Sequence, residues 1–391
     1  MGDRWKEMIF EDAVDINPPR KILRGEVAPH ISMDIVQPFN RTINYFEMKE
    51  FRGSGSRFQN GDTLLARITP CLENGKTAFV SCLPDNAVGH GSTEFIVLSG
   101  KEGISDNLFV YYLSREPDFR NYAIQQMEGS TGRQRVPAKA LSKLTINLPH
   151  LPEQKAIASI LGALDDKIEM NRNMNETLEA MARAIFKSWF VDFDLIPGFG
   201  PHKDWQDSPL GKIPKGWRVG SISNIAEVSS GERPEVRQNL GTADCSIPLY
   251  GGVGQIGFVP VPLYKEPILL TGRVGTLGQI HRIVYASWPS DNTLVFRPYN
   301  KNMFEYFYFN LKSIDFDSLN RGSTQPLVTQ SDLKKQGIVI PPDDVLQYYH
   351  NIAHALFLHI DANDEQSRTL AVIRDALLPK LLSGEIRVKD N

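Results

Sequence analysis

Two stretches of the sequence decide the architecture: LPHLPEQKAIASILGALDDKIEMNRNMNETLEAMARAIF (148–186) and IPPDDVLQYYHNIAHALFLHIDANDEQSRTLAVIRDALL (340–378). They lie 192 residues apart and align without a gap. Identical residues stand at matching positions: Pro149 and Pro341, Ile168 and Ile360, Asn171 and Asn363, Thr177 and Thr369, and Ala184 and Ala376. A repeat of this length indicates two domain-sized copies of one unit rather than a solenoid of short repeats.

Each stretch predicts one long helix, because apolar residues recur at three- and four-residue steps, as in a heptad pattern. Pro152 suits the first turn of the first helix, and Pro197-Gly198 follows its end. The second helix should stop at Ser383-Gly384. The expected helix–helix and partner-docking residues are Ile157, Leu161, Leu164, Ile168, Asn171, Leu178 and Ile185 in the first helix and Leu356, Ile360, Asn363, Leu370 and Leu377 in the second.

The length of these helices constrains how they can be buried. A helix of about 40 residues is roughly 60 Å long, which is too long to be covered by one small domain. The simplest arrangement buries the two stripes against each other in an antiparallel coiled coil with a pseudo-twofold axis. Two ordinary domains that each carry a surface helix are the alternative. Asn171 and Asn363 could set the register of the pair, or could be helix caps or solvated positions.

The sequence before each helix indicates a globular α+β domain. Runs rich in β-branched and aromatic residues, such as TLLARI, EFIVLS, PILLTGRV and NTLVFRP, alternate with Gly, Pro, Asn and Asp, as is typical of short strands. LLARITPCLENGK in the first copy is similar to LLTGRVGTLGQ in the second. We therefore predict two α+β domains joined by two long helices, divided as 1–149 (first domain), 150–195 (first helix), 196–341 (connector and second domain) and 342–391 (second helix).

Charge and composition leave nucleic acid open as a partner. The chain has a net charge of −3, yet residues 196–341 carry 15 basic and 12 acidic side chains. No run of 18 apolar residues predicts a membrane span, and the N-terminus lacks the features of a signal peptide, so we expect a cytoplasmic protein without membrane contact. Cys71, Cys82 and Cys245 form no CxxC pair and fit neither a zinc site nor a disulfide framework.

Three motifs that suggest catalysis or ligand binding fail on their context. NPPR (17–20) is similar to the NPPY-type motif of amino-methyltransferases, but Arg20 replaces the aromatic residue that stacks on the target base. GGVGQIG (251–257) fits a dinucleotide fingerprint, but the prolines that follow preclude the required helix. His350 and His354 lack an acidic ligand nearby on their helix face, so we expect no metal site. No catalytic constellation remains.

Longer stretches of the chain are similar to one family. NLPHLPEQKAIASILGALDDKIEMNRN resembles the central conserved region of type I restriction–modification specificity subunits. LGKIPKGWRVGSISNIAEVSSG resembles the start of their target recognition domains, and IPLYGGVGQIGFV, ILLTGRVGTLGQI and WPSDNTLVF resemble internal motifs of those domains. The resemblance covers essentially the whole chain, although VLQYYHNI departs from the LPEQ-type residues expected at the start of the second helix.

This resemblance implies a non-catalytic subunit that recognises a bipartite, asymmetric site on double-stranded DNA. Two modification subunits, which bind S-adenosylmethionine and methylate adenine, and restriction (motor-nuclease) subunits would complete the complex. The chain itself would bind no cofactor. Its paired helices would set the gap between the half-sites and would give the modification subunits a docking surface.

The candidate DNA-binding residues are of the types that contact phosphates and base edges. In the first domain they are Arg67, Lys76, Arg133, Gln134 and Arg135. In the second domain they are Arg273, Gln279, Asn292, Arg321, Ser323, Thr324 and Gln325. Each of these residues could equally be solvated or stabilise a turn, so the prediction concerns the loops as sets.

Two other classes of function stay open at this point. An enzyme in its own right would be active on DNA as the purified chain, although the expected motifs are missing. A scaffold whose helices bind only protein would show no sequence preference even within a complex. The divergence of the two copies favours recognition, because a symmetric scaffold gains nothing from differences between its domains.

Overall fold

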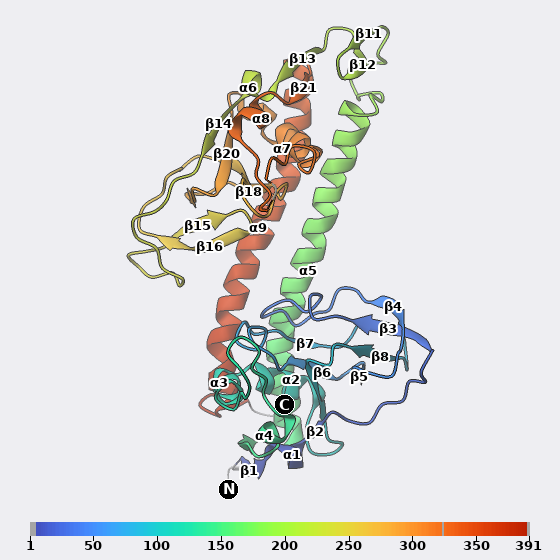
Figure 1. Ribbon diagram of the computed structural model, residues 1–391, viewed down its shortest axis with the longest axis vertical. Helices are drawn as coiled ribbons and strands as arrows, with labels where there is room; N and C mark the ends of the chain where they lie inside the picture. The colour runs from blue at the N-terminus through green and yellow to red at the C-terminus, as the bar shows by residue number, and fades with distance from the viewer. Residues whose placement is uncertain (1–4, 323, 389–391) are drawn as a thin grey trace. The chain divides into compact units, whose positions relative to one another are not determined.

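The computed structural model describes residues 5–322 and 324–388 of the chain, which divides into two compact units (Figure 1). Unit 1 consists of Met1–Asn173 and Asn363–Asn391, and unit 2 consists of Met174–Ala362. Each unit therefore combines one globular part with one segment of each long helix. The compact units cut through both helices and therefore differ from the four consecutive segments expected from the sequence.

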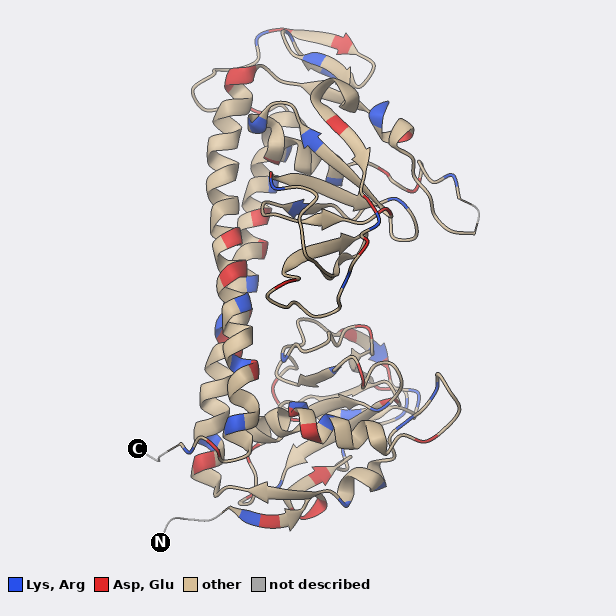
Figure 2. Cartoon of the chain, turned by 90° about the vertical axis from the view of Figure 1, so that its left-hand side faces the viewer, with Lys and Arg blue, Asp and Glu red and all other residues tan. Residues whose placement is uncertain are grey.

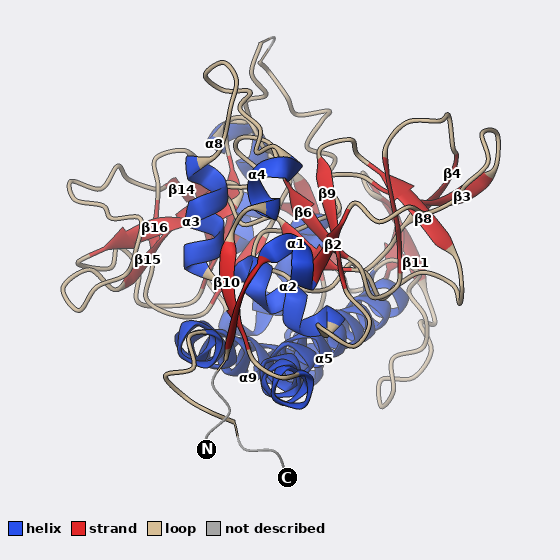
Figure 3. Ribbon diagram, turned by 90° about the horizontal axis from the view of Figure 1, so that it is seen from below, coloured by secondary structure: helices blue, strands red, loops and turns tan. Residues whose placement is uncertain are grey.

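Both predicted long helices are present, as α5 (Leu151–Phe190) and α9 (Asp343–Leu382), with 40 residues each. Gly384 follows α9 with a φ of +74°, the left-handed conformation that commonly ends a helix. Within each unit the two helical segments lie side by side (Figure 3). Acidic and basic side chains are interspersed along both helices, without a stripe of one sign (Figure 2).

In unit 1 the two helical segments are antiparallel. Ile157 and Leu161 of α5 share a hydrophobic core with Leu378 and Leu381 of α9, near the start of one helix and the end of the other. Asn171, further along α5, lies against the earlier part of α9. Rising residue numbers on α5 thus meet falling numbers on α9, as the sequence predicts for this pair.

The side chain of Asn171 joins the two helices. It is fully buried, and its Nδ2 donates to the Asn363 carbonyl oxygen (3.3 Å), to Gln366 Oε1 (2.9 Å) and to Ser367 Oγ (3.1 Å). A buried amide whose Nδ2 finds its acceptors at one axial position disfavours slippage of the helices. Of the roles considered for Asn171, the structure shows the contact across the helix pair.

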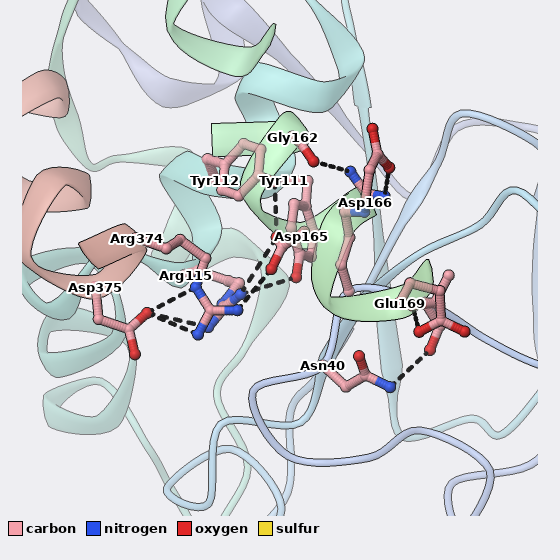
Figure 4. A network of polar contacts seen from close by, with 12 residues as sticks. Asn40, Tyr111, Tyr112, Arg115, Gly162, Asp165, Asp166, Glu169, Arg374 and Asp375 are labelled. Atoms are coloured by element: carbon pink, nitrogen blue, oxygen red, sulfur yellow. Dashed lines mark hydrogen bonds and ion pairs between the residues drawn. The ribbon is translucent and has the colours of Figure 1, made fainter. Parts of the chain in front are cut away.

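A buried ion network holds both helices to the globular part of unit 1 (Figure 4). The Asp165 carboxylate on α5 accepts from Arg374 of α9 at 2.6 Å and from the Tyr112 hydroxyl of α2 (Asn107–Arg115) at 2.7 Å. Arg115 lies 3.9 Å from the same carboxylate. Burial, together with the neighbouring Asp165 charge, raises the pKa of the Tyr112 hydroxyl far above its ordinary value, so this group remains a donor.

The globular part of unit 1 contains two four-stranded sheets and a two-stranded one. The first sheet has the order β2-β9-β6-β7, with β2 (Val14–Ile16), β9 (Phe95–Gly100), β6 (Thr63–Ala66) and β7 (Thr77–Phe79). The second has the order β4-β3-β8-β5, with β4 (Glu47–Glu50), β3 (Val27–Ile31), β8 (Val88–Gly91) and β5 (Ser56–Gln59). The remaining elements are β1 (Lys6–Ile9) paired with β10 (Thr145–Leu148), α1 (Phe10–Ala13), α3 (Pro117–Gln125) and α4 (Ala138–Ser142). The apolar runs of β6 and β9 are almost wholly buried, as expected of central strands.

Unit 2 repeats this topology with one strand fewer in its second sheet. Its first sheet has the equivalent order β14-β20-β17-β18, with β14 (Ala226–Ser230), β20 (Thr293–Pro298), β17 (Ile268–Gly272) and β18 (His281–Ile283). Its second sheet consists of β16 (Gly254–Val259), β15 (Ile247–Gly251) and β19 (Trp288–Pro289). The other elements are β13 (Arg218–Ser221) paired with β21 (Gly337–Ile340), a hairpin of β11 (Trp205–Ser208) and β12 (Gly211–Pro214), α6 (Ile222–Ile225), η1 (Lys301–Met303), α7 (Phe304–Lys312) and α8 (Gln330–Lys334). The matching strand orders confirm the predicted α+β repeat.

Aromatic side chains hold the helices to the globular part of unit 2. Phe186 and Phe190 of α5 lie against Tyr306 of α7 and Tyr349 of α9, with ring centroids 4.8–6.4 Å apart. The Tyr349 hydroxyl donates to the Ala182 carbonyl oxygen at 3.2 Å. The helix direction is antiparallel here as well: Asn171 of α5 contacts Asn363 of α9, whereas Ala182, further along α5, contacts Tyr349, which lies earlier on α9.

At one pair of equivalent positions on the long helices, one copy has charged residues and the other has apolar residues. Through the 192-residue shift, Asp165 corresponds to Phe357, and Arg374 corresponds to Ala182. Asp165 and Arg374 form a buried ion pair in unit 1, whereas Phe357 and Ala182 belong to the apolar core of unit 2. The repeat therefore preserves the pairing of the helices but not the residues that stabilise it.

The predicted docking residues of the helices are buried to different degrees. Ile157, Leu161 and Asn171 are buried. The partly buried members are Leu164, Ile168, Leu178, Ile185, Leu356, Ile360, Asn363, Leu370 and Leu377. The aromatic residues at the C-terminal end of α5 and the ion network lie outside the predicted stripe, although they supply much of the buried contact.

Replacement of Asp165 by alanine should lower the free energy of unfolding by about 1–3 kcal/mol, because it removes one acceptor of the Arg374 guanidinium and the acceptor of the buried Tyr112 hydroxyl, while Asp375 remains paired with Arg374. Urea-induced unfolding followed by circular dichroism measures this change. The adjacent Asp166, whose side chain is 68% exposed, provides the control, since its replacement by alanine should cost about 1 kcal/mol or less. Equal effects of the two variants would contradict a structural role for the buried network.

Candidate nucleic-acid interface

One arginine stands at the same place in both units. Arg67 directly follows β6, and Arg273 directly follows β17, the equivalent strand. The backbone N–H of each donates across the sheet, from Arg67 to the Glu94 carbonyl oxygen and from Arg273 to that of Asn292, at 2.9 Å in both cases. The repeat thus fixes the backbone of these two predicted residues in the same way.

Both arginine side chains hold a buried donor that the protein leaves unsatisfied. The Nε atoms of Arg67 and Arg273 are buried and have no hydrogen-bond partner among the residues that the structure describes. Nη1 of Arg273 donates to Ser230 Oγ at 3.2 Å. A buried donor without a partner costs about 1–3 kcal/mol, so an acceptor supplied by a ligand would be stabilised here.

In unit 1 the Arg67 side chain lines an open cavity of about 290 Å³ together with Arg20 and Arg57. Arg20 forms a salt bridge with Asp62 at 2.9 Å, which compensates its charge. Within residues 5–322 and 324–388, neither Arg57 nor Arg67 forms an ion pair with an acidic side chain. The cavity is therefore electropositive and suits an anionic group such as a phosphate.

The loop of 129–135 lies beside Arg67 and carries three predicted residues. Arg133 is exposed, and Gln134 is half-buried, with its carbonyl oxygen accepting from the Thr69 N–H at 3.0 Å. Arg135 makes a forked pair with Glu94, at donor–acceptor distances of 2.7–3.0 Å, and these hydrogen bonds raise the pKa of Arg135. Arg135 therefore stabilises the loop, and Arg133 is its outward-facing cation.

The equivalent loop of unit 2 (321–327) lies beside Arg273. A β-bridge pairs Val274, the residue after Arg273, with Leu327 of this loop. Thr324 and Gln325 are exposed in this loop. Arg321 forms a salt bridge with Asp332 of α8. Ser323, the remaining predicted residue of the loop, lies outside the described residues.

The other predicted residues lie outside the two loops. Asn292 and Gln279 are exposed, and the Asn292 carbonyl oxygen holds the backbone of Arg273. The structure thus brings Asn292 next to Arg273. Lys76 instead donates from Nζ to the Met33 carbonyl oxygen at 2.8 Å, and it lies with that segment rather than in the cavity of Arg67.

Arg20 and Arg57 were not among the predicted residues. Arg20 belongs to the NPPR motif, which follows β2 in a turn where Asn17 has a φ of 52°. Two hydrogen bonds hold this turn to Val97 of β9. The Asn17 N–H donates to the Val97 carbonyl oxygen (2.7 Å), and the Val97 N–H donates to Asn17 Oδ1 (3.0 Å). An asparagine and two prolines before a basic residue at a strand end were the available signal. Arg57 gave none.

The surroundings of the two equivalent arginines differ. Beside Arg67 the chain after β2 supplies Pro18, Pro19 and Arg20. Beside Arg273 the last residue of β14, Ser230, accepts from the arginine and from Gln330 at 2.8 Å. A shared cation with different polar neighbours is what two sites for different base sequences require.

The other motifs have structural roles. GGVGQIG forms the turn between β15 and β16, where Gly254 has a φ of +117°, and a strand rather than a helix follows it. Cys71, Cys82 and Cys245 are all free. Among the described helices, none combines the length and the apolarity needed to cross a membrane.

Comparison with known proteins assigns the family. Residues 39–180 and 214–373 match the family model described as "Type I restriction modification DNA specificity domain". This chain belongs to the type I specificity subunits. The two matched segments include one recognition part each, in agreement with the internal repeat.

Specificity subunits with similar sequences come from an archaeon and a bacterium. The MjaIX specificity subunit of Methanocaldococcus jannaschii is 29% identical over 314 residues, which cover 74% of this chain and 71% of that protein. The HindI specificity subunit of Haemophilus influenzae is 24% identical over 428 residues, covering 87% and 90%. The type I S subunit from M. genitalium, a solved structure, has the same fold, with a TM-score of 0.58, 17% identity and coverage of 97% and 96%. As a specificity subunit the chain is not catalytic, since catalysis lies in partner subunits.

Replacement of Arg67 by alanine should weaken DNA binding by the specificity subunit more than it destabilises the fold. Because the Arg67 Nε has no hydrogen-bond partner in the described part of the chain, the free energy of unfolding should change by about 1 kcal/mol or less. Loss of a contact to DNA should weaken binding about tenfold, as a difference of 1–3 kcal/mol predicts. Lys143, an exposed residue after α4, is the control for a nonspecific loss of charge. Strong destabilisation with unchanged DNA affinity would show that Arg67 is a structural residue.

Proposed function

We propose that this specificity subunit recognises a bipartite, asymmetric target on double-stranded DNA, with one half contacted by each unit. The observation that supports it most directly is the pair of equivalent arginines, Arg67 and Arg273. Each holds a buried Nε without a partner among the described residues, at the same point of the repeated sheet and beside a loop whose sequence differs between the copies. A shared anchor with divergent neighbours suits two different half-sites.

The chemistry of the loops divides their residues between two tasks. Arginine and lysine bind phosphate or guanine, whereas asparagine and glutamine suit adenine. In unit 1 we assign Arg67 and Arg133 to direct contact, Gln134 to base recognition, and Arg135 to support of the loop through Glu94. Lys76 is assigned to the periphery, because it is engaged by the Met33 carbonyl.

The same division applies to unit 2. Arg273, Gln279, Asn292, Thr324 and Gln325 are the candidates for contact with DNA, and all but Arg273 are exposed. Arg321 corresponds to Arg135 in its role, since its salt bridge with Asp332 ties the loop to α8. We retain Ser323 as a candidate from the sequence alone.

Membership of the family suggests which other subunits bind this chain. We propose that two modification subunits, which hold S-adenosylmethionine and methylate adenine, bind this subunit in the cytoplasm, and that restriction subunits complete the nuclease. The chain itself would bind no cofactor for these reactions. The helices α5 and α9 would set the gap between the half-sites and supply a docking surface. Exposed apolar side chains on α5, at Ile160, Met170, Met174 and Met181, support a protein partner along this helix.

A methylome tests this function. The chain is co-expressed with its modification subunit in a host without DNA methylation, and native DNA is sequenced for modified adenines. We expect one split motif, with two short specified halves around a gap of fixed length. A soluble complex that modifies no base would reject recognition and favour the scaffold.

The same assay distinguishes base contacts from phosphate contacts. Replacement of Gln134 by alanine should relax a single position in one half of the motif, at a cost of about 1–3 kcal/mol. A uniform loss of methylation across all sites would instead identify a phosphate contact. The exposed Lys143→Ala variant should leave the motif and its level of methylation unchanged.

A further inference from the structure

Apart from DNA recognition, we infer that Glu305, His350 and His354 form a binding site in unit 2 for one divalent transition-metal ion of the zinc class. His350 and His354 are one helical turn apart on α9, and Glu305 lies on α7. The sequence offered no acidic residue close to these histidines on their face of α9. The tertiary fold supplies one from the recognition part of the unit.

The three side chains already converge. Nδ1 of His350 lies 2.6 Å from Glu305 Oε2, and Nδ1 of His354 lies 3.0 Å from Glu305 Oε1. The two imidazole rings are stacked, with centroids 4.9 Å apart. The glutamate side chain is only 1% exposed, whereas the histidines are 16% and 44% exposed, so the site is open on one side.

Their chemistry fits zinc better than a hard cation. One potential ligand atom from each residue lies within 4.8 Å of the other two. Ligands around a tetrahedral Zn²⁺ lie about 3.3 Å apart, given bonds of about 2.0–2.1 Å, so a small outward shift of the imidazoles would admit the ion. Two imidazoles select Zn²⁺ and its first-row neighbours over Mg²⁺ and Ca²⁺, which prefer oxygen ligands.

The open side of the site faces a cavity of about 610 Å³, which leaves room for a water molecule as the fourth ligand. Positively charged side chains in the cavity wall would weaken the binding of a metal ion unless acidic side chains compensate them. Arg282 forms a salt bridge with Asp361 at 2.7 Å, and Arg297 pairs with Glu266 at 2.7 Å, so both cations are compensated. Lys301 also lines the cavity.

The other copy of the repeat shows that the fold does not need these polar residues. Aligning α2 with α7 and applying the 192-residue shift to the long helices places Leu108, Ala158 and Gly162 at the equivalent positions of unit 1. There the elements pack closely: a Cβ atom on Gly162 would lie 3.3 Å from a methyl group of Leu108 and 3.5 Å from Nη1 of Arg41. Unit 2 places a carboxylate and two imidazoles where unit 1 packs small and aliphatic groups. A bound ion explains this exchange, and it would clamp α7 to α9 without any catalytic role.

Metal titration of the purified full-length chain tests the site. After treatment with a chelator, the protein is titrated with Zn²⁺ in competition with a chromophoric chelator, and with Co²⁺ followed by visible absorption. We expect one equivalent of Zn²⁺ to bind with a micromolar or lower Kd. The Co²⁺ spectrum should show d–d bands without a thiolate charge-transfer band, because the ligands are imidazole and carboxylate.

Three variants locate the ion. Glu305→Gln and His354→Gln should each weaken Zn²⁺ binding at least tenfold, whereas His359→Ala, at an exposed histidine on the same helix, should bind as the wild type does. Zn²⁺ should raise the Tm of the wild type and of the His359 variant but not that of His354→Gln, whose half-exposed position makes misfolding a poor explanation. Absence of saturable binding up to millimolar Zn²⁺, or equal binding by all variants, would overturn the site. Neither result bears on DNA recognition.

Discussion

The whole molecule depends on the burial of two long amphipathic helices. A helix of 40 residues with a narrow apolar stripe extends beyond what its own globular domain can cover. The helix of each copy is therefore covered partly by the helix of the other, which places 363–382 in unit 1 and 174–190 in unit 2. Since neither copy can satisfy its helix alone, both recognition parts are built on a pair of helices that come from opposite halves of the chain.

The two copies meet this constraint with different chemistry. Unit 1 uses a buried ion network around Asp165, and unit 2 uses an aromatic core around Phe186 and Tyr349. A buried ion pair contributes little net stability compared with apolar packing, but it penalises any arrangement that separates its members. Its effect is therefore on specificity: the segment of α9 that carries Arg374 is matched to unit 1, because against the aromatic core of unit 2 Arg374 would keep only Asp375 of its own helix as a partner.

The recognition parts show the same combination of a shared frame and divergent detail. The sheet order and the backbone hydrogen bonds of Arg67 and Arg273 are common to both units. The side chains around these arginines are not, since Arg20 and Arg57 flank one of them and Ser230 contacts the other. Under the proposed function, a common arginine with different neighbours would allow one protein chain to present two different surfaces to DNA.

The sequence by itself determined the repeat, the two long helices with their antiparallel pairing, and the equivalent positions of Arg67 and Arg273 in the two copies, because these depend on local periodicity and on comparison of one copy with the other. Contacts between distant segments were decided only by the tertiary structure. The pairing of Arg135 with Glu94, the position of Arg20 beside Arg67, and the approach of Glu305 to His350 each join residues more than 40 positions apart. No spacing rule links such residues, since it is the packing of strands and helices that brings their side chains together.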